Sequence, residues 1–497
     1  MGNQPIHWAD VIAHDVAGPQ VIATGITPSG NIHIGNLREV VTGDAIRRAI
    51  ISSGAEGNLI FIADTFDPLR TVYPFLPPRF KKYVGMPLSE IPDPFGCCVS
   101  YSEHYLAPFL ESLDELAITP GVYRADLMYK AGQYTTAITT ALEQRDKIAQ
   151  IIETVSGRRL EPQWNPFNPL CAHCGRISSA EILQHVPEMT CVEYRCQCGA
   201  EGVADYSKGE GKLAWRVDWP ARWKILSVTI EPFGKDHAVA GGSYDTGRLI
   251  SKEVYDYDPP RPVPYGHIHL KGQGKMSSSK GITVTIQEML DVVPPDVLRF
   301  MIIKTKPEKL IDFDPGLGLL TLIDEFDHGR GRAVELSEVS GQTSTIPFRH
   351  MVTAVQIARN LDELIEVLRR SGYTSHNVRD LKRLAENVGN WLDRFAPSFV
   401  KFKVQETLPV QAKTLTKGQK QLLLKLAAAL KLDSNDPEWL HNEIYNISAQ
   451  LGVDAKSSFK AVYIALLGEN SGPRAGWFLA SLNPQFVVSR FEEAGST

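Results

Sequence analysis

Two short segments of the chain contain residue types that could carry out phosphate chemistry. In the first, 28-PSGNIHIGN-36, His33 and Asn36 lie three residues apart on either side of Gly35. Residues with this spacing share one face of a helical turn, so both side chains could donate hydrogen bonds to a polyphosphate. Gly35 would let a flat ring approach the backbone. An N-capping turn with an incidental histidine explains the same residues, and the motif alone favours that simpler interpretation.

The second segment, 272-GQGKMSSSKG-281, has the composition of a clamp for departing pyrophosphate. Lys275 and Lys280 flank three hydroxyl groups, and glycines bracket the run. Two ammonium groups on such a loop could stabilise developing negative charge. A solvated surface loop is an equal alternative for this segment alone, but both motifs in one chain favour the chemical interpretation. The residues assigned to the clamp are Lys275, Met276, Ser277, Ser278, Ser279 and Lys280.

The first motif lies where a buried strand should give way to a helix. The apolar run 21-VIATGI-26 predicts the strand, and apolar residues at helical spacing over 34–46 predict the helix. A second apolar run, 58-NLIFIAD-64, predicts the next strand, so the three elements should form a parallel βαβ unit. Ligands of such sheets bind at the carboxyl ends of the strands, and helix N-termini attract phosphate.

The chain then changes character several times. Residues 66–100 are rich in proline and aromatic residues and predict an irregular excursion, whereas 103–117 and 132–156 have helical spacing. Beyond about residue 285 the pattern stays helical, with helices expected over 353–370 and 418–432 and a linker at 339–347. Strands are expected again at 213-LAWRVD-218, 224-KILSVTIEPFG-234 and 265-YGHIHL-270.

Four cysteines in the non-helical segment 162–212 have the spacing of a metal site, and thiolates so spaced suit tetrahedral Zn²⁺. The segment lacks a water-activating His/Glu set, so we expect the zinc to be structural. Cys191 is a spare thiol that could replace one ligand, whereas Cys97 and Cys98 are expected to be core or reactive thiols rather than ligands. The four predicted ligands are Cys171, Cys174, Cys196 and Cys198.

The bulk composition indicates an ordinary water-soluble protein of more than one domain. The chain has 497 residues, 43% hydrophobic and 22% charged, with a net charge of −5. It contains no apolar run long enough to span a membrane, and its first residues lack the order of a signal peptide, so we expect a cytoplasmic protein with no membrane partner. Residues 341–497 hold 19 Lys/Arg against 15 Asp/Glu, a modest basic excess that is weak evidence for a nucleic-acid partner.

These motifs together resemble those of the class I aminoacyl-tRNA synthetases. HIGN is similar to their HIGH signature and KMSSS to their KMSKS signature. The closer resemblance is to the archaeal-type class I lysyl-tRNA synthetase family, and it covers nearly the whole chain. It rests on TGITPSGNIHIGN, FIADTFDPLR, the cysteine module, EPFGKDHAVAGGSYDTG, LKGQGKMSSSKG and GPRAG, in that family's order. Two positions depart from the class signatures: Asn36 replaces a histidine, and Ser278 replaces a lysine whose charge Lys280 could supply.

The resemblance implies a Rossmann-type parallel-sheet catalytic domain with an inserted zinc module, followed by an all-α helical-cage domain that binds the anticodon. It implies boundaries at 1–160, 161–212, 213–335 and 345–497. The implied reaction joins lysine to ATP with Mg²⁺, releases pyrophosphate, and transfers the lysyl group to the 3′-terminal ribose of tRNA(Lys). Neither step needs a protein nucleophile, since positioning and charge stabilisation suffice. We expect a monomer with no DNA partner.

The lysine pocket needs a carboxylate and an aromatic face to select an ammonium group. Asp64 ends the second strand at the expected sheet edge, and Asp67 could serve instead. A helix cap or an ion pair with Arg70 explains Asp64 equally well. The residues assigned to lysine are Gly25, Thr27, Asp64, Trp215, His237 and Tyr265. Those assigned to ATP are Pro28, Ser29, Gly30, Gly234 and Asp236. Possible tRNA phosphate contacts, each more simply a solvated cation, are Arg359, Arg369, Arg370, Lys382 and Arg383.

Three alternatives to this function remain open. A glutamyl- or glutaminyl-type enzyme would want an arginine facing the substrate carboxylate, and the first strand offers none. A catalytically silent tRNA-binding paralogue would have no need for both intact motifs. A nucleotidylyltransferase could share the H-x-G turn but would not explain the KMSSSKG segment or the long helical C-terminal region.

Overall fold

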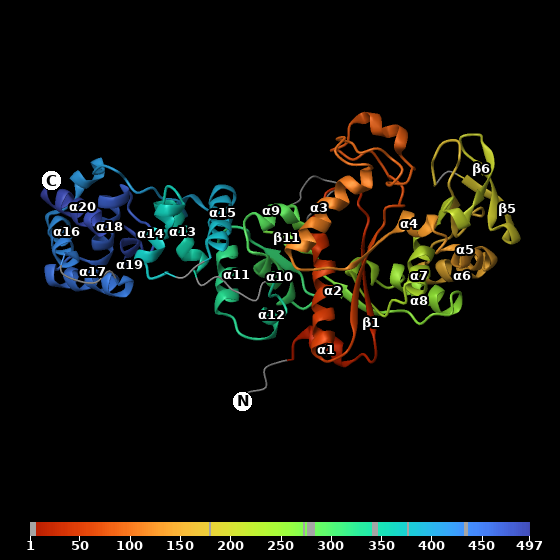
Figure 1. Cartoon of the computed structure of the whole chain (residues 1–497), viewed down its shortest axis with the longest axis horizontal. Helices are drawn as coiled ribbons and strands as arrows, with labels where there is room; N and C mark the ends of the chain where they lie inside the picture. Colours follow the sequence, from red (N-terminus) through yellow and green to blue (C-terminus); the bar gives the residue numbers. More distant parts are fainter. Residues whose placement is uncertain are drawn as a thin grey trace. The chain divides into compact units, whose positions relative to one another are not determined.

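The computed structural model describes residues 6–177, 180–271, 274–275 (backbone only), 284–339, 346–374, 377–431 and 436–497. The chain divides into two compact units, and Figure 1 labels some of their helices and strands. The first unit comprises 1–289, 295–313 and 330–339, and the second comprises 290–294, 314–329 and 340–497. Among the described residues, no helix combines the length and apolar character needed to cross a membrane.

A five-stranded parallel sheet forms the centre of the first unit, as predicted. The strand order is β10-β9-β1-β2-β3. The first strand of the chain, β1, is central; β2 and β3 follow on one side of it and β9 and β10 on the other, which is the doubly wound arrangement. The growth direction reverses between β1 and β9, and ligands of such folds bind outside the carboxyl ends of the strands at this point. The strands are β1 (Gln20–Ile26), β2 (Gly57–Ala63), β3 (Gly121–Arg124), β9 (Ile230–Gly234) and β10 (Arg261–Tyr265).

The first βαβ unit agrees with its prediction. β1 and β2 pair in parallel along their whole length, and α2 (Ile34–Ser52) packs against both strands. Polar positions of α2 such as Arg38 and Asp44 are also buried, so the helix is enclosed on most sides. β1 pairs with β9 only at Ile22 and Ile230. Toward its carboxyl end β1 is therefore not paired with β9, and the Gly25 N–H donates instead to the Glu39 side chain.

The remaining elements of the first unit surround this sheet and continue beyond it. Within the predicted irregular excursion 66–100 the structure has one short 3₁₀ helix, η1 (Pro78–Tyr83). A second small sheet, β12-β11-β13, joins β12 (Gly274–Lys275), β11 (Ile268–Leu270) and β13 (Ile311–Phe313), and β13 lies in a region expected to be helical. The helices are α1 (Trp8–His14), α3 (Tyr101–Glu115), α4 (Ala125–Lys130), α5 (Thr135–Glu143), α6 (Arg145–Ser156), α7 (Trp215–Ile225), α8 (Ser243–Glu253), α9 (Ile286–Leu290), α10 (Pro295–Ile303) and α12 (Arg332–Glu335).

The cysteine-bearing segment is built from strands and 3₁₀ turns within its described residues, as expected. β5, β6 and β7 form an antiparallel sheet, while β4 pairs with β8 at its base. Phe167, Val192 and Leu213 of this segment also belong to a hydrophobic core shared with α4, α5 and α6, so strand hydrogen bonds and core packing together hold it. Its elements are β4 (Phe167–Pro169), β5 (Ala180–Val186), η2 (Pro187–Met189), β6 (Cys191–Cys196), β7 (Glu201–Asp205), η3 (Tyr206–Lys208) and β8 (Gly211–Leu213).

The strand expected at 213–218 is wrong, because this stretch opens helix α7. Trp215, Trp219 and Trp223 recur every four residues, and their rings pack in sequence at 5.3 and 5.2 Å between centroids. This helical period extends over three turns, whereas the apparent alternation in LAWRVD covers only six residues. The tryptophan spacing was the more informative signal.

Among its described residues, the second unit has helices and connecting segments but no strand. The single helix expected over 353–370 is instead two helices, because the Asn360 side chain caps a new helix by accepting a hydrogen bond from the Glu363 N–H. The helix expected over 418–432 is confirmed as α16, and most of the predicted linker, 340–345, lies outside the described residues. The helices are α11 (Leu317–His328), α13 (Phe348–Ile357), α14 (Leu361–Arg370), α15 (Val378–Arg394), α16 (Lys417–Leu430), α17 (Pro437–Leu451), α18 (Ala455–Leu467), α19 (Ala475–Ser481) and α20 (Pro484–Ser496).

Candidate active site

The first motif forms the N-terminal cap of α2. His33 is the N-cap residue, and its Nδ1 atom accepts a hydrogen bond from the Gly35 N–H at 3.0 Å. The Asn36 side-chain oxygen accepts from the His33 backbone N–H at 3.2 Å, which completes a capping box. Because Nδ1 is an acceptor, the proton of the neutral ring lies on Nε2, which is then a donor. Capping and phosphate binding are therefore compatible roles of one arrangement.

The chain just beyond the second motif lies beside the first. Lys275 belongs to β12, which pairs with β11. Thr285, just beyond the motif, forms a β-bridge with His33. The neighbouring Val284 carbonyl accepts a hydrogen bond from the Ile34 N–H at 3.3 Å. The chain leaving the clamp segment is thus joined to the N-terminal cap of α2. The Lys275 side chain and the predicted residues Met276, Ser277, Ser278, Ser279 and Lys280 lie outside the described residues.

The residues assigned to ATP lie at the same edge of the sheet. Pro28, Ser29 and Gly30 follow β1 directly, and the Ser29 carbonyl accepts a hydrogen bond from the Tyr101 hydroxyl at 2.8 Å. Gly234 ends β9, and Asp236 follows in a 3₁₀ turn (Lys235–His237). Residues 28–30 thus follow the carboxyl end of β1, and Gly234 and Asp236 lie at and just beyond the carboxyl end of β9. The growth direction of the sheet reverses between these two strands.

A glutamate outside both motifs lies beside the end of β1. Glu39, on α2, accepts a hydrogen bond from the Gly25 N–H at 2.6 Å and another from the Tyr265 hydroxyl at 2.7 Å. Burial raises the pKa of Glu39 to about 8, against the effect of both hydrogen bonds. The residue is still partly exposed. Among the described residues it forms no ion pair, so its carboxylate would lack a counter-ion.

A second buried glutamate, Glu231 on β9, has a different environment. One of its oxygens accepts a hydrogen bond from Trp219 Nε1 at 2.9 Å, and the other accepts from Trp223 Nε1. Burial raises the pKa of Glu231 to about 7. Because both oxygens are already bound to indole groups, Glu231 positions the tryptophans, whereas Glu39 keeps an accessible surface.

Two of the residues assigned to lysine, Trp215 and His237, pack together beside β9, whereas Tyr265 lies on β10 and donates to Glu39. Trp215 is 38% exposed and stacks on the buried Trp219. The His237 ring lies 6.2 Å from Trp215 and 5.6 Å from Trp219 between centroids, and burial lowers its pKa. This aromatic wall, made of Trp215, Trp219 and His237, includes one member that the sequence prediction missed.

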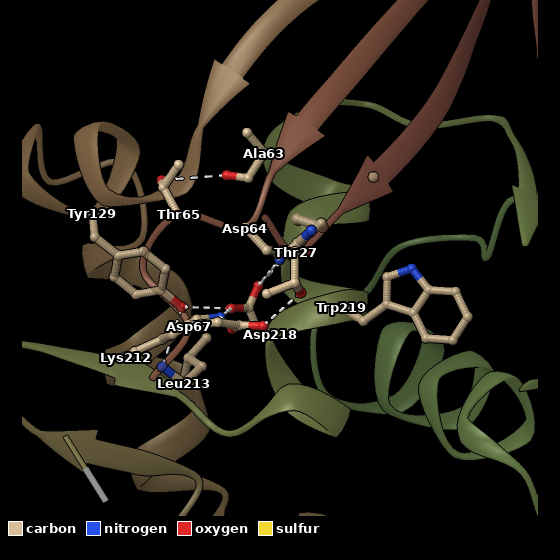
Figure 2. Close-up of polar contacts among 12 residues, drawn as sticks. Thr27, Ala63, Asp64, Thr65, Asp67, Tyr129, Lys212, Leu213, Asp218 and Trp219 are labelled. Carbon is tan, nitrogen blue, oxygen red and sulfur yellow. Dashed lines mark hydrogen bonds and ion pairs between the residues drawn. The ribbon is translucent and has the colours of Figure 1, made fainter. Parts of the chain in front are cut away.

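Three aspartates and two cations form a buried ion cluster, which we call the Asp218 cluster (Figure 2). Arg222 lies 2.6 Å from Asp64 and 3.0 Å from Asp218. Lys212 lies 3.2 Å from Asp67 and also contacts Asp218. Although burial opposes the change, Arg222 and Lys212 lower the pKa of Asp218 to about 2.

The Asp218 cluster also holds residues predicted to bind lysine. Thr27 donates a hydrogen bond to Asp67 at 2.9 Å, while Tyr129 and Tyr134 donate to Asp218 at 3.1 and 3.2 Å (Figure 2 labels the first of these tyrosines). Burial raises the pKa of Asp64, and its ion pair with Arg222 offsets this only in part. The partner of Asp64 is thus Arg222, not the Arg70 considered from the sequence.

Comparison with known proteins finds a matching family model and relatives that align over nearly the whole chain. A family model described as "tRNA synthetases class I (K)" matches residues 6–354. A lysine–tRNA ligase from Methanosarcina barkeri is 50% identical over 527 aligned positions, covering 99% of this chain and 98% of that protein. A lysine–tRNA ligase from Archaeoglobus fulgidus is 49% identical over 499 positions, covering 98% and 100%.

This chain belongs to the class I tRNA synthetase family. Among solved structures, a glutamate tRNA ligase from Elizabethkingia meningosepticum superposes with a TM-score of 0.48 at 13% identity, covering 96% of this chain and 99% of that one. That similarity is too low to support an argument.

In this class I synthetase, the four predicted zinc ligands converge. The Sγ atoms of Cys171 and Cys198 are 3.7 Å apart, as are those of Cys174 and Cys196. A tetrahedral zinc with Zn–S bonds of about 2.3 Å requires S···S distances of about 3.8 Å, so the donor set fits the ion. All four sulfurs lie within 4.8 Å of one another, and Cys191 is not among them.

One signal in the sequence could have identified Glu39. It follows Asn36 by three residues, so helical spacing places it on the same face of α2 as the HIGN motif. The partners of Asp218 were harder to find, since Lys212 and Tyr129 come from other elements.

Two of the five possible tRNA contacts on the helical unit are paired with carboxylates. Arg359 lies 3.0 Å from Glu406, and Arg369 lies 2.8 Å from Glu366. Arg370 donates to a backbone carbonyl, that of residue 481, at 3.1 Å. Lys382 and Arg383 are exposed on α15.

Proposed function

We propose that this protein is a lysine–tRNA ligase. It activates lysine with ATP to lysyl-adenylate and pyrophosphate, then transfers the lysyl group to the 3′-terminal ribose of tRNA(Lys). The observation that carries the amino-acid assignment is Glu39, a partly accessible carboxyl at the switch point with no cationic partner among the described residues. Full-length relatives named lysine–tRNA ligase at 49–50% identity support the same conclusion.

Glu39 is suited to bind the lysine side-chain ammonium. Burial disfavours its charged form, and an incoming ammonium would restore that charge and supply the missing counter-ion. Asp64 and Asp67 are poorer candidates, because Arg222 and Lys212 already neutralise them. The aromatic wall beside β9 would contact the aliphatic part of the substrate. Gly25, Thr27, Trp215, His237 and Tyr265 therefore keep their proposed place around lysine, with Asp64 behind them.

A glutamate substrate would not fit this pocket. Arg222 does lie near Gly25, since its Nη1 atom would be 3.9 Å from a Cβ placed there. Its charge, however, is matched by Asp64 and Asp218, so it is not free to bind a substrate carboxylate. A pocket rich in carboxyl groups repels an acidic side chain and attracts a basic one.

The phosphate side of the reaction belongs to the cap of α2. The Nε2–H of His33 would donate a hydrogen bond to the ATP phosphates, assisted by the Asn36 side chain and the Gly35 backbone. Lys275 and Lys280 would stabilise the departing pyrophosphate. Mg²⁺ would accompany the nucleotide and neutralise part of its charge. Pro28, Ser29, Gly30, Gly234 and Asp236 would hold the nucleoside, with the Asp236 carboxylate toward the ribose.

The remaining assignments complete the proposal. The catalytic domain would span 1–160 and 213–335, interrupted by a structural zinc module at 161–212, and the helices of 345–497 would bind the anticodon. The enzyme would act as a cytoplasmic monomer with no DNA or membrane partner.

The deciding experiment is ATP–pyrophosphate exchange with tRNA present, run across all twenty amino acids. We expect exchange with lysine alone. Exchange with a different amino acid would refute the role of Glu39, and no exchange with any of them would favour the silent tRNA-binding paralogue.

A His33→Asn variant tests the phosphate assignment separately from stability. Asparagine is a good N-cap but has no donor at the position of Nε2, so α2 should keep its stability while adenylate formation slows by about 10- to 100-fold. His33→Ala, which removes both the cap and the donor, is the matched comparison. Equal exchange rates for wild type and His33→Asn would refute the phosphate contact.

A further inference from the structure

A basic segment of the chain begins shortly after β2. Residues 68–89 contain four cationic side chains and no acidic one, although the whole chain has a net charge of −5. Water-exposed surfaces usually carry both signs of charge interspersed, so a run of one sign indicates an anionic partner. The cations, all exposed, are Arg70, Arg79, Lys81 and Lys82.

The short helix η1 turns its cations outward through its three-residue period. Residues three apart in a 3₁₀ helix lie in one row along its surface. Phe80 and Tyr83 form the inward row, with Phe80 buried and the two ring centroids 5.2 Å apart. Arg79 and Lys82 form the second row, and Lys81 lies in the third. Both rows that face solvent therefore carry positive charge.

The basic segment packs on a hydrophobic core of its own. Leu76 and Phe80 are buried together with Tyr101 and Tyr105 of α3. Because the apolar side chains of the segment are fixed in this way, its cations project from a defined surface rather than from a loose loop.

These cations are not neutralised by the protein. Among the described residues, none of the four forms an ion pair with a carboxylate. Arg79 donates a hydrogen bond to the Pro94 carbonyl at 3.2 Å, and Lys82 Nζ lies 4.7 Å from the centroid of the Tyr83 ring. The positive charge of the segment is thus available to phosphate groups, in contrast to the arginines of the second unit that pair with glutamates.

An aromatic pair lies within the same segment. The rings of Tyr73 and Phe75 stack with centroids 5.5 Å apart and planes 11° apart. Phe75 also packs edge-on against Tyr105 at 5.9 Å, which anchors the pair in the core, while Tyr73 stays partly exposed. Cations next to aromatic rings are typical of surfaces that bind single-stranded nucleic acid, because bases stack on the rings and phosphates pair with the cations.

Hydrogen bonds fix the basic segment to the edge of the sheet that carries the candidate active site. The Leu88 N–H donates to the Asp67 carbonyl and the Ser89 N–H to the Thr65 carbonyl, both at 2.9 Å. The Tyr101 hydroxyl donates to the Ser29 carbonyl, in the turn after β1, at 2.8 Å. A strand bound along the segment would therefore have one end beside the carboxyl ends of β1 and β2.

We propose that Arg70, Arg79, Lys81 and Lys82, with Tyr73, bind the single-stranded 3′ end of tRNA and direct it to this edge of the sheet. This inference rests on the proposed function, since transfer of the lysyl group requires the terminal ribose there. Contacts to phosphates and to base faces read no sequence, so the surface adds affinity for every tRNA rather than a choice among them.

The first test measures how tightly the full-length protein binds unfractionated tRNA, either intact or with its single-stranded 3′ nucleotides removed. Wild type should bind the trimmed tRNA about tenfold more weakly. Arg70→Gln/Lys81→Gln/Lys82→Gln should bind both forms equally weakly, and its log–log salt slope for intact tRNA should be shallower by about 2. If the variant distinguished intact from trimmed tRNA as strongly as wild type does, the proposal would be wrong.

The matched control removes the same charge from three exposed cations that already pair with carboxylates. Lys147→Gln/Arg195→Gln/Lys208→Gln should retain the wild-type difference between intact and trimmed tRNA. A loss as large as that of the segment variant would assign the effect to net charge and overturn the proposal.

A second test needs no variant, so misfolding cannot affect it. An N-hydroxysuccinimide acetate ester labels exposed lysines, and peptide mass spectrometry reads each rate. With intact tRNA at about ten times its Kd, acetylation of Lys81 and Lys82 should slow about tenfold, because only the unbound protein reacts. Trimmed tRNA should not slow it, and Lys208, whose side chain is 73% exposed, should react at one rate throughout. Equal rates at Lys81 and Lys82 with and without intact tRNA would refute the surface.

Aminoacylation kinetics distinguish this surface from a structural role. The segment variant should raise KM for tRNA about tenfold and leave KM for ATP unchanged. A raised KM for ATP with an unchanged KM for tRNA would show that the substitutions act through the Ser29 turn, against the proposal. Because tRNA binding and lysine acetylation need no activated amino acid, failure of the proposed function would be recognised separately.

Discussion

Two neighbouring groups of buried carboxylates in this synthetase have opposite environments. Asp218 is surrounded by Arg222, Lys212 and two tyrosine hydroxyls, and its pKa is held near 2. Glu39 has two hydrogen-bond donors but no cation among the described residues, and its pKa is raised to about 8. The charge of Asp218 is balanced by protein cations, whereas the charge of Glu39 would be balanced only by a cationic ligand. Charge balance thus separates a structural cluster from a binding site more clearly than burial does.

Removing the central charge of the Asp218 cluster should have the largest effect. Asp218→Asn would leave Lys212 and Arg222 facing an amide, and breaking a buried ion pair costs about 3–5 kcal/mol of unfolding free energy. Denaturant unfolding followed by tryptophan fluorescence would measure it. The control is Asp146→Asn, whose side chain is 96% exposed and which should change stability by less than about 0.5 kcal/mol. A similarly small loss in Asp218→Asn would mean that the cluster is not structural.

Removing the charge of Glu39 should affect binding instead. Glu39→Gln keeps the shape of the side chain but cannot pair with an ammonium group, so KM for lysine should rise about 100-fold with stability nearly unchanged. Glu231→Gln is the matched comparison, since its oxygens already accept from two indoles and its effect should be smaller. If Glu231→Gln raised KM for lysine more than Glu39→Gln did, the lysine ammonium would bind at Glu231 on β9 instead of at Glu39.

The raised pKa of Glu39 predicts a pH dependence of lysine binding. Below pH 8 the empty site holds a proton that must leave when the ammonium binds. Affinity should therefore increase about tenfold per pH unit from pH 6 to pH 8 and level off above that, with about 0.9 proton released at pH 7. Calorimetry in buffers of different ionisation enthalpy measures this release. Proton uptake, or no exchange of protons, would contradict the assignment.

The smallest effect should come from the hydrogen bond between Tyr265 and Glu39. Tyr265→Phe removes a donor that stabilises the carboxylate, so the pKa of Glu39 should rise further. At pH 7 lysine binding should weaken by less than tenfold, and the pH at which affinity levels off should move upward. A downward shift of that pH would show that the hydroxyl does not serve the carboxylate.

Local patterns were enough to predict the first βαβ unit, because β1, α2 and β2 each show their own periodicity. For Glu39 the local signal was weaker: its spacing from Asn36 places it on the HIGN face of α2, but buried polar residues such as Arg38 and Asp44 obscure which face meets the site. Asp218 illustrates a second limit, since its partners come from β8, α4 and α7. The cysteine module was predictable because all four ligands lie close together in the chain.

Helix α2 joins the two ends of the proposed substrate site in one rigid element. His33 and Asn36 occupy its start, and Glu39 follows within two turns. At 1.5 Å of rise per residue, about 9 Å of helix axis separates His33 from Glu39. In the proposed site, the length of this helix segment would set the distance between the activated carboxylate and the side-chain ammonium. A shorter diamino acid would leave its ammonium away from Glu39 while its carboxylate reacts, so selection for chain length would be a property of helix geometry.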